Sequence, residues 1–281
     1  MESSLLFDDF VPTTSPAAAY IGGKRRLARP ITRAIDRIPH HSYAEVFVGM
    51  GGIFLRRSRK APVEIINDWS EDVATFFRIL QRHYVAFLDM LRFQLTTRAG
   101  FERLLRVDPS TMTDLERAAR FLYLQRLAFG GKVAGRSFGV SPSEPGAFDV
   151  TKLGPLLEAI HERLAGAVIE RLHWRDFVHR YDREATLFYL DPPYYGSEGD
   201  YGRDLFSRDQ FAVMADTLRE AKGTFLFSIN DHPEIRRIFD GFAMTELQLL
   251  YSVGGGGNQM EARELVISNL PSDRLKDLLA M

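Results

Sequence analysis

The chain has 281 residues, of which 45% are hydrophobic and 26% charged, and this composition excludes a disordered, collagen-like or low-complexity protein. It contains no cysteine, which excludes disulfides, cysteine-ligated zinc and a thiol nucleophile. The 36 Lys and Arg residues nearly balance the 37 Asp and Glu residues, so the net charge of -1 does not by itself indicate a polyanionic partner, and only local basic clusters can do so.

Targeting and metal-binding signals are absent from the sequence. No apolar run reaches the roughly 20 residues that a membrane-spanning helix requires, so we expect no membrane association. Residues 1–17 carry acidic side chains where a secretion signal carries basic ones, which predicts a flexible tail and a cytoplasmic protein. The seven histidines lack metal-ligand spacing, and we expect no metal ion.

The first part of the chain alternates helix-like and strand-like segments. Apolar residues at helical intervals predict a helix over 24–37, and a buried strand over 43–49 runs into a glycine turn and a second helix from residue 53. A strand over 63–68 and a long helix over 71–95 follow. This alternation is typical of an α/β fold, in which helices cover a parallel sheet.

The middle of the chain has a different composition. Residues 98–130 have a helical pattern with many arginines, and residues 130–150 are rich in Gly, Ser and Pro, which predicts an exposed loop or hairpin. We therefore expect a mainly helical insert over residues 91–165. The catalytic domain into which it is inserted then comprises residues 18–90 and 166–281.

The last part again predicts sheet strands. Hydrophobic strands over 186–190 and 224–230 flank a helix over 207–221. Residues 244–253 and 264–270 are strand-like and are separated by a glycine-rich run, which predicts an antiparallel hairpin.

The sharpest chemical signal is Asp191-Pro192-Pro193-Tyr194, directly after the strand over 186–190. In open α/β sheets, ligands bind beyond the carboxyl ends of the strands. Two prolines remove N–H donors and leave carbonyl acceptors, which with the aspartate carboxylate suit an amino group on a flat ring. The tyrosine can stack on that ring, so these four residues are the candidate catalytic residues. The alternative is a turn that only ends the strand.

Three further segments indicate a nucleotide-like ligand. Glu45 begins the run EVFVGMGG, in which a strand meets glycines that allow close approach of the backbone to a ligand. Asp68 ends the next strand, where an acid can accept from both hydroxyls of a ribose. The run from Tyr20 to Lys24, YIGGK, offers a cation for a carboxylate. Taken singly, these segments also fit an ordinary turn, a helix cap and a loop.

In their order and spacing, these four motifs resemble those of the amino-methylating DNA methyltransferases of the DNA adenine methylase type, over residues 18–270. The resemblance implies a Rossmann-like, S-adenosylmethionine-dependent methyltransferase sheet whose insert recognises DNA. It implies a site-specific enzyme that transfers a methyl group from S-adenosylmethionine to N6 of adenine in double-stranded DNA, by direct attack after the base is flipped out. A restriction endonuclease is then a candidate partner.

The resemblance also implies roles for single residues. Lys24 is expected at the methionine carboxylate, and Asp68 at the ribose hydroxyls. The cofactor contacts that it implies are Tyr20, Lys24, Phe47, Gly49, Gly51, Asp68, Asp176, Phe177 and Asp191. Of these, Asp176 and Phe177 are expected to border the adenine of the cofactor. Residues 191–194 are expected to hold the target base. The sequence departs from the family at Val46, where proline is usual, and in the loop over 130–150, which matches the GATC-recognising hairpin only loosely.

Two basic segments fit a DNA substrate, because phosphates require local positive charge. Residues 24–37 carry six basic and one acidic side chain, and residues 92–136 carry nine basic and four acidic ones. Most of these arginines are expected on solvated helix faces. Arg126, and Lys132 and Arg136 in the glycine-rich loop, are the candidate DNA-binding residues.

Several alternatives stay open. Methylation of N4 of cytosine needs the same acceptors, although Asp rather than Ser at the start of the tetrapeptide favours adenine. An RNA adenine methyltransferase is disfavoured by the basic insert. A nicotinamide oxidoreductase shares the strand, turn and acid pattern but lacks G-x-G-x-x-G. Intact Asp191 and Lys24 argue against a non-catalytic DNA-binding protein, and carbon-5 cytosine methylation needs a thiolate that this chain lacks.

Overall fold

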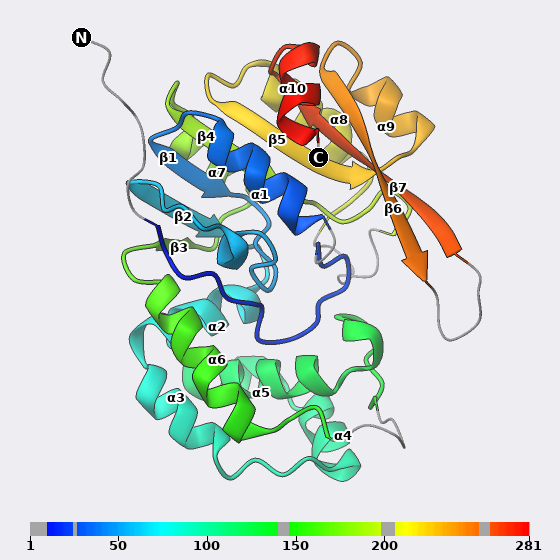
Figure 1. The fold of residues 1–281 in the computed structure, drawn as a ribbon. Helices are drawn as coiled ribbons and strands as arrows, with labels where there is room; N and C mark the ends of the chain where they lie inside the picture. The colour runs from blue at the N-terminus through cyan, green and yellow to red at the C-terminus, as the bar shows by residue number, and fades with distance from the viewer. Residues whose placement is uncertain (1–9, 25–26, 140–145, 198–205, 253–258, 281) are drawn as a thin grey trace.

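The part of the chain that the structure describes has a seven-stranded sheet at its centre (Figure 1). The computed structural model describes residues 10–24, 27–139, 146–197, 206–252 and 259–280. In the strand order β3-β2-β1-β4-β5-β7-β6, the first five strands are parallel and β7 is antiparallel to both β5 and β6. The predicted α/β sheet with a carboxyl-terminal antiparallel hairpin is therefore confirmed, although residues 253–258 of that hairpin lie outside the described residues.

The strands follow the predicted order closely. Their bounds are β1 (Ser42–Glu45), β2 (Val63–Asn67), β3 (Val168–Glu170), β4 (Thr186–Leu190), β5 (Thr224–Asn230), β6 (Ala243–Ser252) and β7 (Gln259–Ser268). β4 is buried at all five of its positions, as expected for a hydrophobic strand in the middle of a parallel sheet.

Two hydrophobic cores cover the two faces of the sheet. Successive side chains of a strand point to opposite faces, so Tyr43 and Leu187 enter one core while Ala44 and Phe188 enter the other. The first core contains α1 (Ala28–Arg37) and α10 (Ser272–Leu279), and the second contains α7 (Trp174–Tyr181), α8 (Gln210–Arg219) and α9 (Pro233–Ile238). Among the described residues, no helix is long and apolar enough to cross a bilayer.

A layer of helices lies beside the sheet, at the bottom of Figure 1. It consists of α2 (Glu71–Arg82), α3 (Tyr84–Leu91), α4 (Arg98–Arg106), α5 (Asp114–Leu127) and α6 (Val150–Arg163). A capping box between Thr113 and Glu116 starts α5, which is the central helix of the layer and contacts α2, α3 and α4. The insert is thus mainly helical, and its bounds at 91 and 165 stay a prediction, since α2 and α3 belong to the same layer.

The predicted helix from residue 53 is wrong. Only one 3-10 turn, η1 (Phe54–Arg56), forms there, and the backbone of Arg57 is extended. The cause is a buried ion pair: Arg57, which is 1% exposed, donates from NH1 to Glu64 Oε1 at 2.7 Å, and Arg163 pairs with the same carboxylate. A continuing helix would carry the Arg57 side chain away from that partner.

The long helix predicted over 71–95 is two helices. His83 has φ −129° and ψ 34°, which is not helical, and it separates α2 from α3. The bend lets Phe87 of α3 pack back against Phe76 of α2, with ring centroids 6.1 Å apart. Both rings are fully buried, so the contact contributes apolar burial that a straight helix would not gain.

The predicted flexible tail over 1–17 is ordered from residue 10. Residues 1–9 lie outside the described residues. The N–H of Val11 donates to the carbonyl of Ser58, and the N–H of Thr14 donates to the carbonyl of Leu55. Ala17 is completely buried. Residues 10–17 are therefore paired with the segment that follows the glycine turn.

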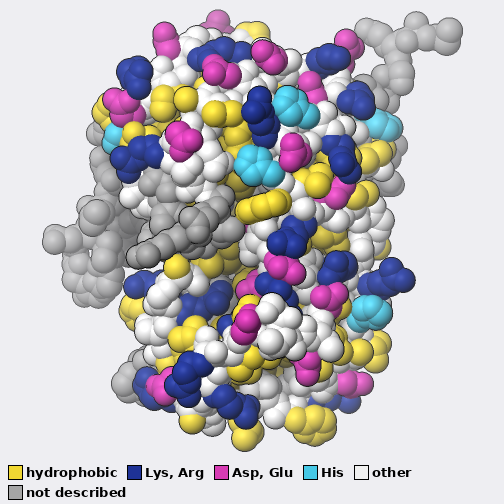
Figure 2. Space-filling model, turned by 180° about the vertical axis from the view of Figure 1, so that it is seen from behind, with side chains coloured by type: hydrophobic (Ala, Val, Ile, Leu, Met, Phe, Trp, Pro, Cys, Tyr) yellow, Lys and Arg dark blue, Asp and Glu magenta, His cyan; other side chains and the backbone are white. Residues whose placement is uncertain are grey.

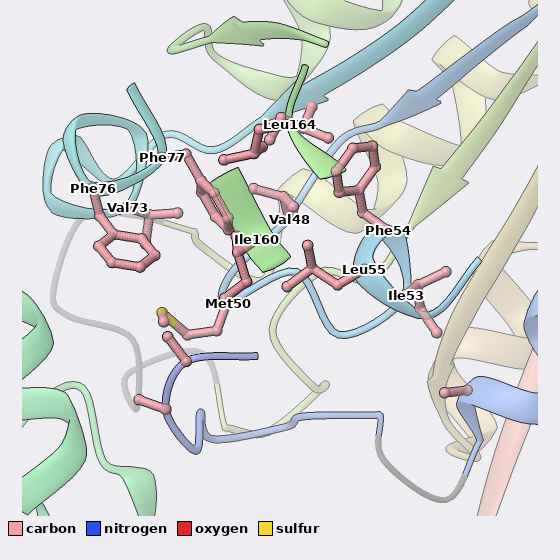
Figure 3. Close-up of a cluster of buried hydrophobic side chains, with 14 of the residues drawn as sticks. Val48, Met50, Ile53, Phe54, Leu55, Val73, Phe76, Phe77, Ile160 and Leu164 are labelled. Carbon is pink, nitrogen blue, oxygen red and sulfur yellow. The ribbon is translucent and has the colours of Figure 1, made fainter. Parts of the chain in front are cut away.

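One part of the first core joins the sheet to the helical layer (Figure 3). Side chains from the glycine turn and η1 point toward side chains of α2 and α6. The residues concerned are Val48, Met50, Ile53, Phe54, Leu55, Val73, Phe76, Phe77, Ile160 and Leu164. Side chains of α2 and α6 therefore pack against the glycine turn and hold it in place.

A substitution at Gly51 can test the packing of this turn. Its φ is +80°, and an added Cβ would lie 2.9 Å from Cγ and Cδ1 of Leu55. We expect Gly51→Ala to lower the free energy of unfolding by about 2–4 kcal/mol, from backbone strain and overpacking together. Gly135→Ala is the matched control, because Gly135 has φ +60° and no atom within 4 Å of an added Cβ. That variant should lose about 1 kcal/mol from strain alone in urea unfolding, and equal losses would contradict the packing argument.

Candidate active site

A cavity of about 530 Å³ lies at the carboxyl ends of β1, β2 and β4. Its volume lies within the range of roughly 300–1,000 Å³ found for small-molecule sites. Four parts of the chain line it: residues 15–24, the turn after β1, the residues after β2, and the loop after β4. Segments that are far apart in the sequence therefore meet at one edge of the sheet, where α/β sheets bind ligands.

Seven of the twelve residues predicted to be catalytic or cofactor-binding line this cavity. They are Tyr20, Lys24, Phe47, Gly49, Asp68, Asp191 and Pro193. Gly51 instead packs against Leu55, and Pro192 is buried within the loop and is not among the lining residues. Tyr194 is not among the lining residues but contacts one of them, Lys24.

Asp176 and Phe177 do not reach the cavity. Phe177 is fully buried in the second core, and Asp176 is exposed in the first turn of α7. Trp69 lines the cavity instead, and its ring lies 5.9 Å from that of His173, the cap residue of α7. A cofactor role for Asp176 and Phe177 stays a prediction.

The carboxylate of Asp68 is fixed by two backbone donors. Gly49 N donates to Oδ2 and Ser70 N donates to Oδ1, each at 2.9 Å. Burial raises the pKa of Asp68 to about 6. Each oxygen retains acceptor capacity, so a pair of neighbouring hydroxyls on a ligand could donate to it and offset the cost of desolvation. This pair of acceptor oxygens fits the two hydroxyls of a ribose.

A buried cation lies at the other end of the cavity. Lys24, with a side chain 2% exposed, donates from Nζ to Asp191 Oδ1 at 2.9 Å and to the hydroxyl of Tyr194 at 2.9 Å. It also pairs with Glu264 of β7, whose Oε2 accepts from Tyr194 at 2.7 Å. The ammonium thus has two carboxylates and a phenol around it, and Tyr194 is tied into the same network.

These neighbours set the ionisation of the site. Burial alone would lower the pKa of Lys24, but Asp191 and Glu264 outweigh it and raise the pKa well above its ordinary value. Burial raises the pKa of Asp191 to about 6, although Lys24 opposes the shift. Burial likewise raises the pKa of the Tyr194 phenol. At neutral pH the lysine is therefore charged and Tyr194 is a neutral hydroxyl.

Glu45 adds a second acid to the cavity wall. It is 2% exposed, lines the cavity and accepts a 2.6 Å hydrogen bond from the hydroxyl of Tyr43. Burial raises the pKa of Glu45 to about 8. The side chain is thus mostly protonated at neutral pH and presents a neutral polar group.

Strand β5 holds the loop after β4 in place. Asn230 accepts from Tyr195 N at 2.9 Å and donates to Tyr195 O at 3.1 Å, which clamps the backbone of the loop. Ser228 lies 3.3 Å from Asp191 Oδ1 and 2.8 Å from the hydroxyl of Tyr189. The sequence patterns did not identify Glu264, Ser228 or Asn230 as site residues. The one available signal was a polar or acidic residue within an otherwise apolar strand.

The three candidate DNA-binding residues differ in their surroundings. Arg126 donates to the carbonyls of Ala147 and Ala17, and Arg136 donates from NH2 to Gln125 Oε1 at 3.0 Å. Burial lowers the pKa of both guanidinium groups. Lys132 is exposed. Two of the three side chains thus have partners within the protein, and the DNA-binding role of all three stays a prediction.

The glycine turn, the carboxylate of Asp68 and the Asp-Pro-Pro-Tyr loop thus meet at one cavity, which is the arrangement expected from the resemblance to amino-methylating enzymes. Residues 20–253 match the family of D12 class N6 adenine-specific DNA methyltransferases. The chain belongs to this family.

Two relatives agree with this assignment. The chain is 22% identical over 262 residues to the type II methyltransferase M.CviBI of Paramecium bursaria Chlorella virus NC1A, covering 90% of this chain and 99% of the relative. It is 23% identical over 276 residues to the type II methyltransferase M1.LlaDCHI of Lactococcus lactis subsp. cremoris, covering 90% and 95%. The similarity extends over the insert as well as the sheet.

The raised pKa of Asp191 predicts an acid limit to activity. The carboxylate must be ionised to accept a hydrogen bond from the target amine, and its pKa is about 6. We expect kcat to fall about tenfold per pH unit below pH 6 and to level off above it. Single-turnover methylation rates from pH 5 to pH 8 measure this. A profile that stays flat down to pH 5 would contradict it.

Glu264→Gln tests the network around Lys24. The variant keeps the shape but removes a charge that raises the pKa of Asp191. We expect kcat to fall by about tenfold to a hundredfold, because Tyr194 loses its anionic acceptor, and the acid limb of the rate profile to move to lower pH.

Glu246→Gln is the matched control, since Glu246 pairs with Arg236 at the surface. It should leave both kcat and the profile unchanged. An unshifted acid limb in Glu264→Gln would show that Glu264 does not act on Asp191.

Proposed function

We propose that the chain is a site-specific DNA methyltransferase that methylates N6 of adenine in double-stranded DNA, using S-adenosylmethionine. One observation carries the proposal. Asp191, the first residue of the Asp-Pro-Pro-Tyr loop, lines the same cavity as Asp68 and the glycine turn. The acceptor for a target amine and the acceptor for a ribose thus belong to one continuous site.

The cavity wall fits the cofactor chemically. S-adenosylmethionine supplies a methyl group bonded to a positively charged sulfur. Asp68 would accept from the ribose hydroxyls, and the rings of Tyr20, Phe47 and Trp69 give the wall aromatic surface for an adenine. Lys24 is already neutralised by Asp191 and Glu264, so the wall beside it suits a cationic group. Its contact with the methionine carboxylate would have to compete with these two partners.

The loop after β4 would hold the target base. Among the described residues, the contacts to the Asp191 carboxylate use Oδ1 alone, which leaves Oδ2 to accept from N6. The Pro192 carbonyl would accept the second N–H. These two bonds favour a localised lone pair on a nitrogen that is otherwise conjugated with the ring, and attack then depends on positioning and electrostatics.

A base within a duplex must leave the stack to reach this loop. Flipping costs a few kcal/mol, which stacking on the Tyr194 ring would partly offset. The Tyr194 hydroxyl is held by Lys24 and Glu264, so the ring has a fixed orientation before DNA binds. Fixing the ring in advance lowers the entropy cost of binding the base.

Recognition of DNA would fall to the insert and its basic residues. The face opposite that of Figure 1 shows Lys and Arg intermingled with Asp and Glu (Figure 2), as expected for a nearly neutral protein. That face shows no broad region of a single charge. Both relatives are named type II methyltransferases, which supports a restriction endonuclease as a partner of this chain.

Labelled S-adenosylmethionine and unmethylated genomic DNA test the proposal. We expect the label in N6-methyladenine within one sequence context. Asp191→Ala should lower the rate by about a thousandfold or more. Its melting temperature should also fall, because the variant removes one of the two carboxylates that pair with the buried ammonium of Lys24, so residual binding of S-adenosylhomocysteine is the check that the site is still folded. Label in N4-methylcytosine, or transfer to RNA in preference to DNA, would replace adenine in DNA as the target. Normal transfer by Asp191→Ala would contradict the mechanism.

A further inference from the structure

Residues 15–24, here called the wall segment, line the cavity without belonging to any helix or strand. Nine of the ten residues contact the cavity, so the position of this segment determines the shape of the site. Figure 1 shows it in dark blue, running between the sheet and the helical layer. A coil at this place needs partners outside itself to have one conformation.

The insert supplies those partners. Gln125 of α5 donates from Nε2 to Ala19 O at 2.8 Å, and the next residue, Arg126, donates to Ala17 O. The N–H of Ile21 donates to Gly131 O at 3.1 Å. Alternate residues of the wall segment are thus bonded to α5 and to the turn η3 (Phe129–Gly131) that follows it.

Gln125 is the centre of this arrangement. It is 1% exposed, and its Nε2 donates to Gly131 O at 2.7 Å as well as to Ala19 O. Its Oε1 accepts from Arg136 NH2 at 3.0 Å. The buried side-chain amide of Gln125 therefore connects the wall segment, the turn η3 and the glycine-rich loop of the insert.

Arg136 extends the connection toward the surface. Its guanidinium also donates from Nε to Lys132 O at 3.2 Å, so it closes the loop between residues 132 and 136. The backbone at Gly131 also packs closely against the wall segment, because a Cβ added there would lie 3.0–3.1 Å from backbone atoms of Ala19 and Tyr20. A displacement of this loop would be transmitted to the wall segment through direct contacts.

We propose that Gln125 is a positioning residue for the cofactor, because it holds the wall segment in place. Arg136 in turn holds the side-chain amide of Gln125 and so acts on the wall segment indirectly. This inference rests on the proposed function, since it takes the cavity to be the S-adenosylmethionine site. It assigns Arg136 to the support of the site, in place of the direct contact with DNA that the sequence predicts.

Binding of S-adenosylhomocysteine, measured by titration calorimetry without DNA, tests the proposal. Gln125→Met keeps the volume of the side chain and removes all three hydrogen bonds. We expect its Kd to rise about tenfold, and the KM for S-adenosylmethionine to rise with it, while kcat stays within about twofold. The matched control is Gln81→Met, because Gln81 donates to the carbonyls of Leu164 and Ala167, away from the cavity.

Arg136 provides a second test that leaves Gln125 in place. Arg136→Met should weaken binding of S-adenosylhomocysteine several-fold in the absence of DNA. Arg136→Lys, which keeps a cationic donor for Oε1, should restore the affinity to within about twofold of the wild type. Lys132→Ala should leave it unchanged, since Lys132 contributes its backbone carbonyl to the network.

The outcomes separate this inference from the proposed function. Wild-type affinity in both Gln125→Met and Arg136→Met would overturn the inference and leave the methyltransferase proposal standing. Equal losses in Gln125→Met and Gln81→Met would reduce Gln125 to a general packing role and also overturn it. Failure of the wild-type protein to bind S-adenosylhomocysteine would instead reject the cofactor site itself.

Discussion

The ammonium of Lys24 is buried between the carboxylates of Asp191 and Glu264, and the rest of the site depends on this contact. A buried charge is tolerated only when it is paired and hydrogen-bonded. The pairing therefore requires the amino-terminal wall segment, the loop after β4 and strand β7 to come together. Loss of one partner would leave an uncompensated buried charge. The free-energy cost of that charge would exceed the net stabilisation that the intact pair provides.

The antiparallel edge of the sheet consequently contributes to the candidate active site. In the register of β5 and β7, Glu264 lies opposite Asn230. Asn230 holds the backbone of the loop after β4, and Glu264 holds Tyr194 of the same loop. Two neighbouring strands that run in opposite directions thus fix one short loop from two sides. The two residues are neighbours because β5 and β7 run antiparallel, which places the end of β5 beside the middle of β7.

Sequence patterns predicted what depends on local signals. The strands over 186–190 and 224–230 are mainly apolar, and Asp68 and Asp191 follow strand ends, so the sheet and much of the cavity could be predicted. Tertiary contacts decided the remainder. The helix expected from residue 53 gave way to the ion pair of Arg57, and Glu264 became a site residue only through its pairing across the sheet. Arg136 looked like a free basic residue because its partner is eleven positions away.

The bonds between α5 and the wall segment bear on how such enzymes acquire new target sequences. If the insert recognises DNA and the wall segment contacts the cofactor, as proposed above, then the part of the chain that carries Gln125, Arg126 and Gly131 serves both roles, because these residues hydrogen-bond the wall segment. Exchange of the insert alone between two relatives would join mismatched surfaces, so specificity and cofactor affinity would change together. Natural recombination and laboratory grafting should therefore succeed more often when the amino-terminal segment travels with the insert.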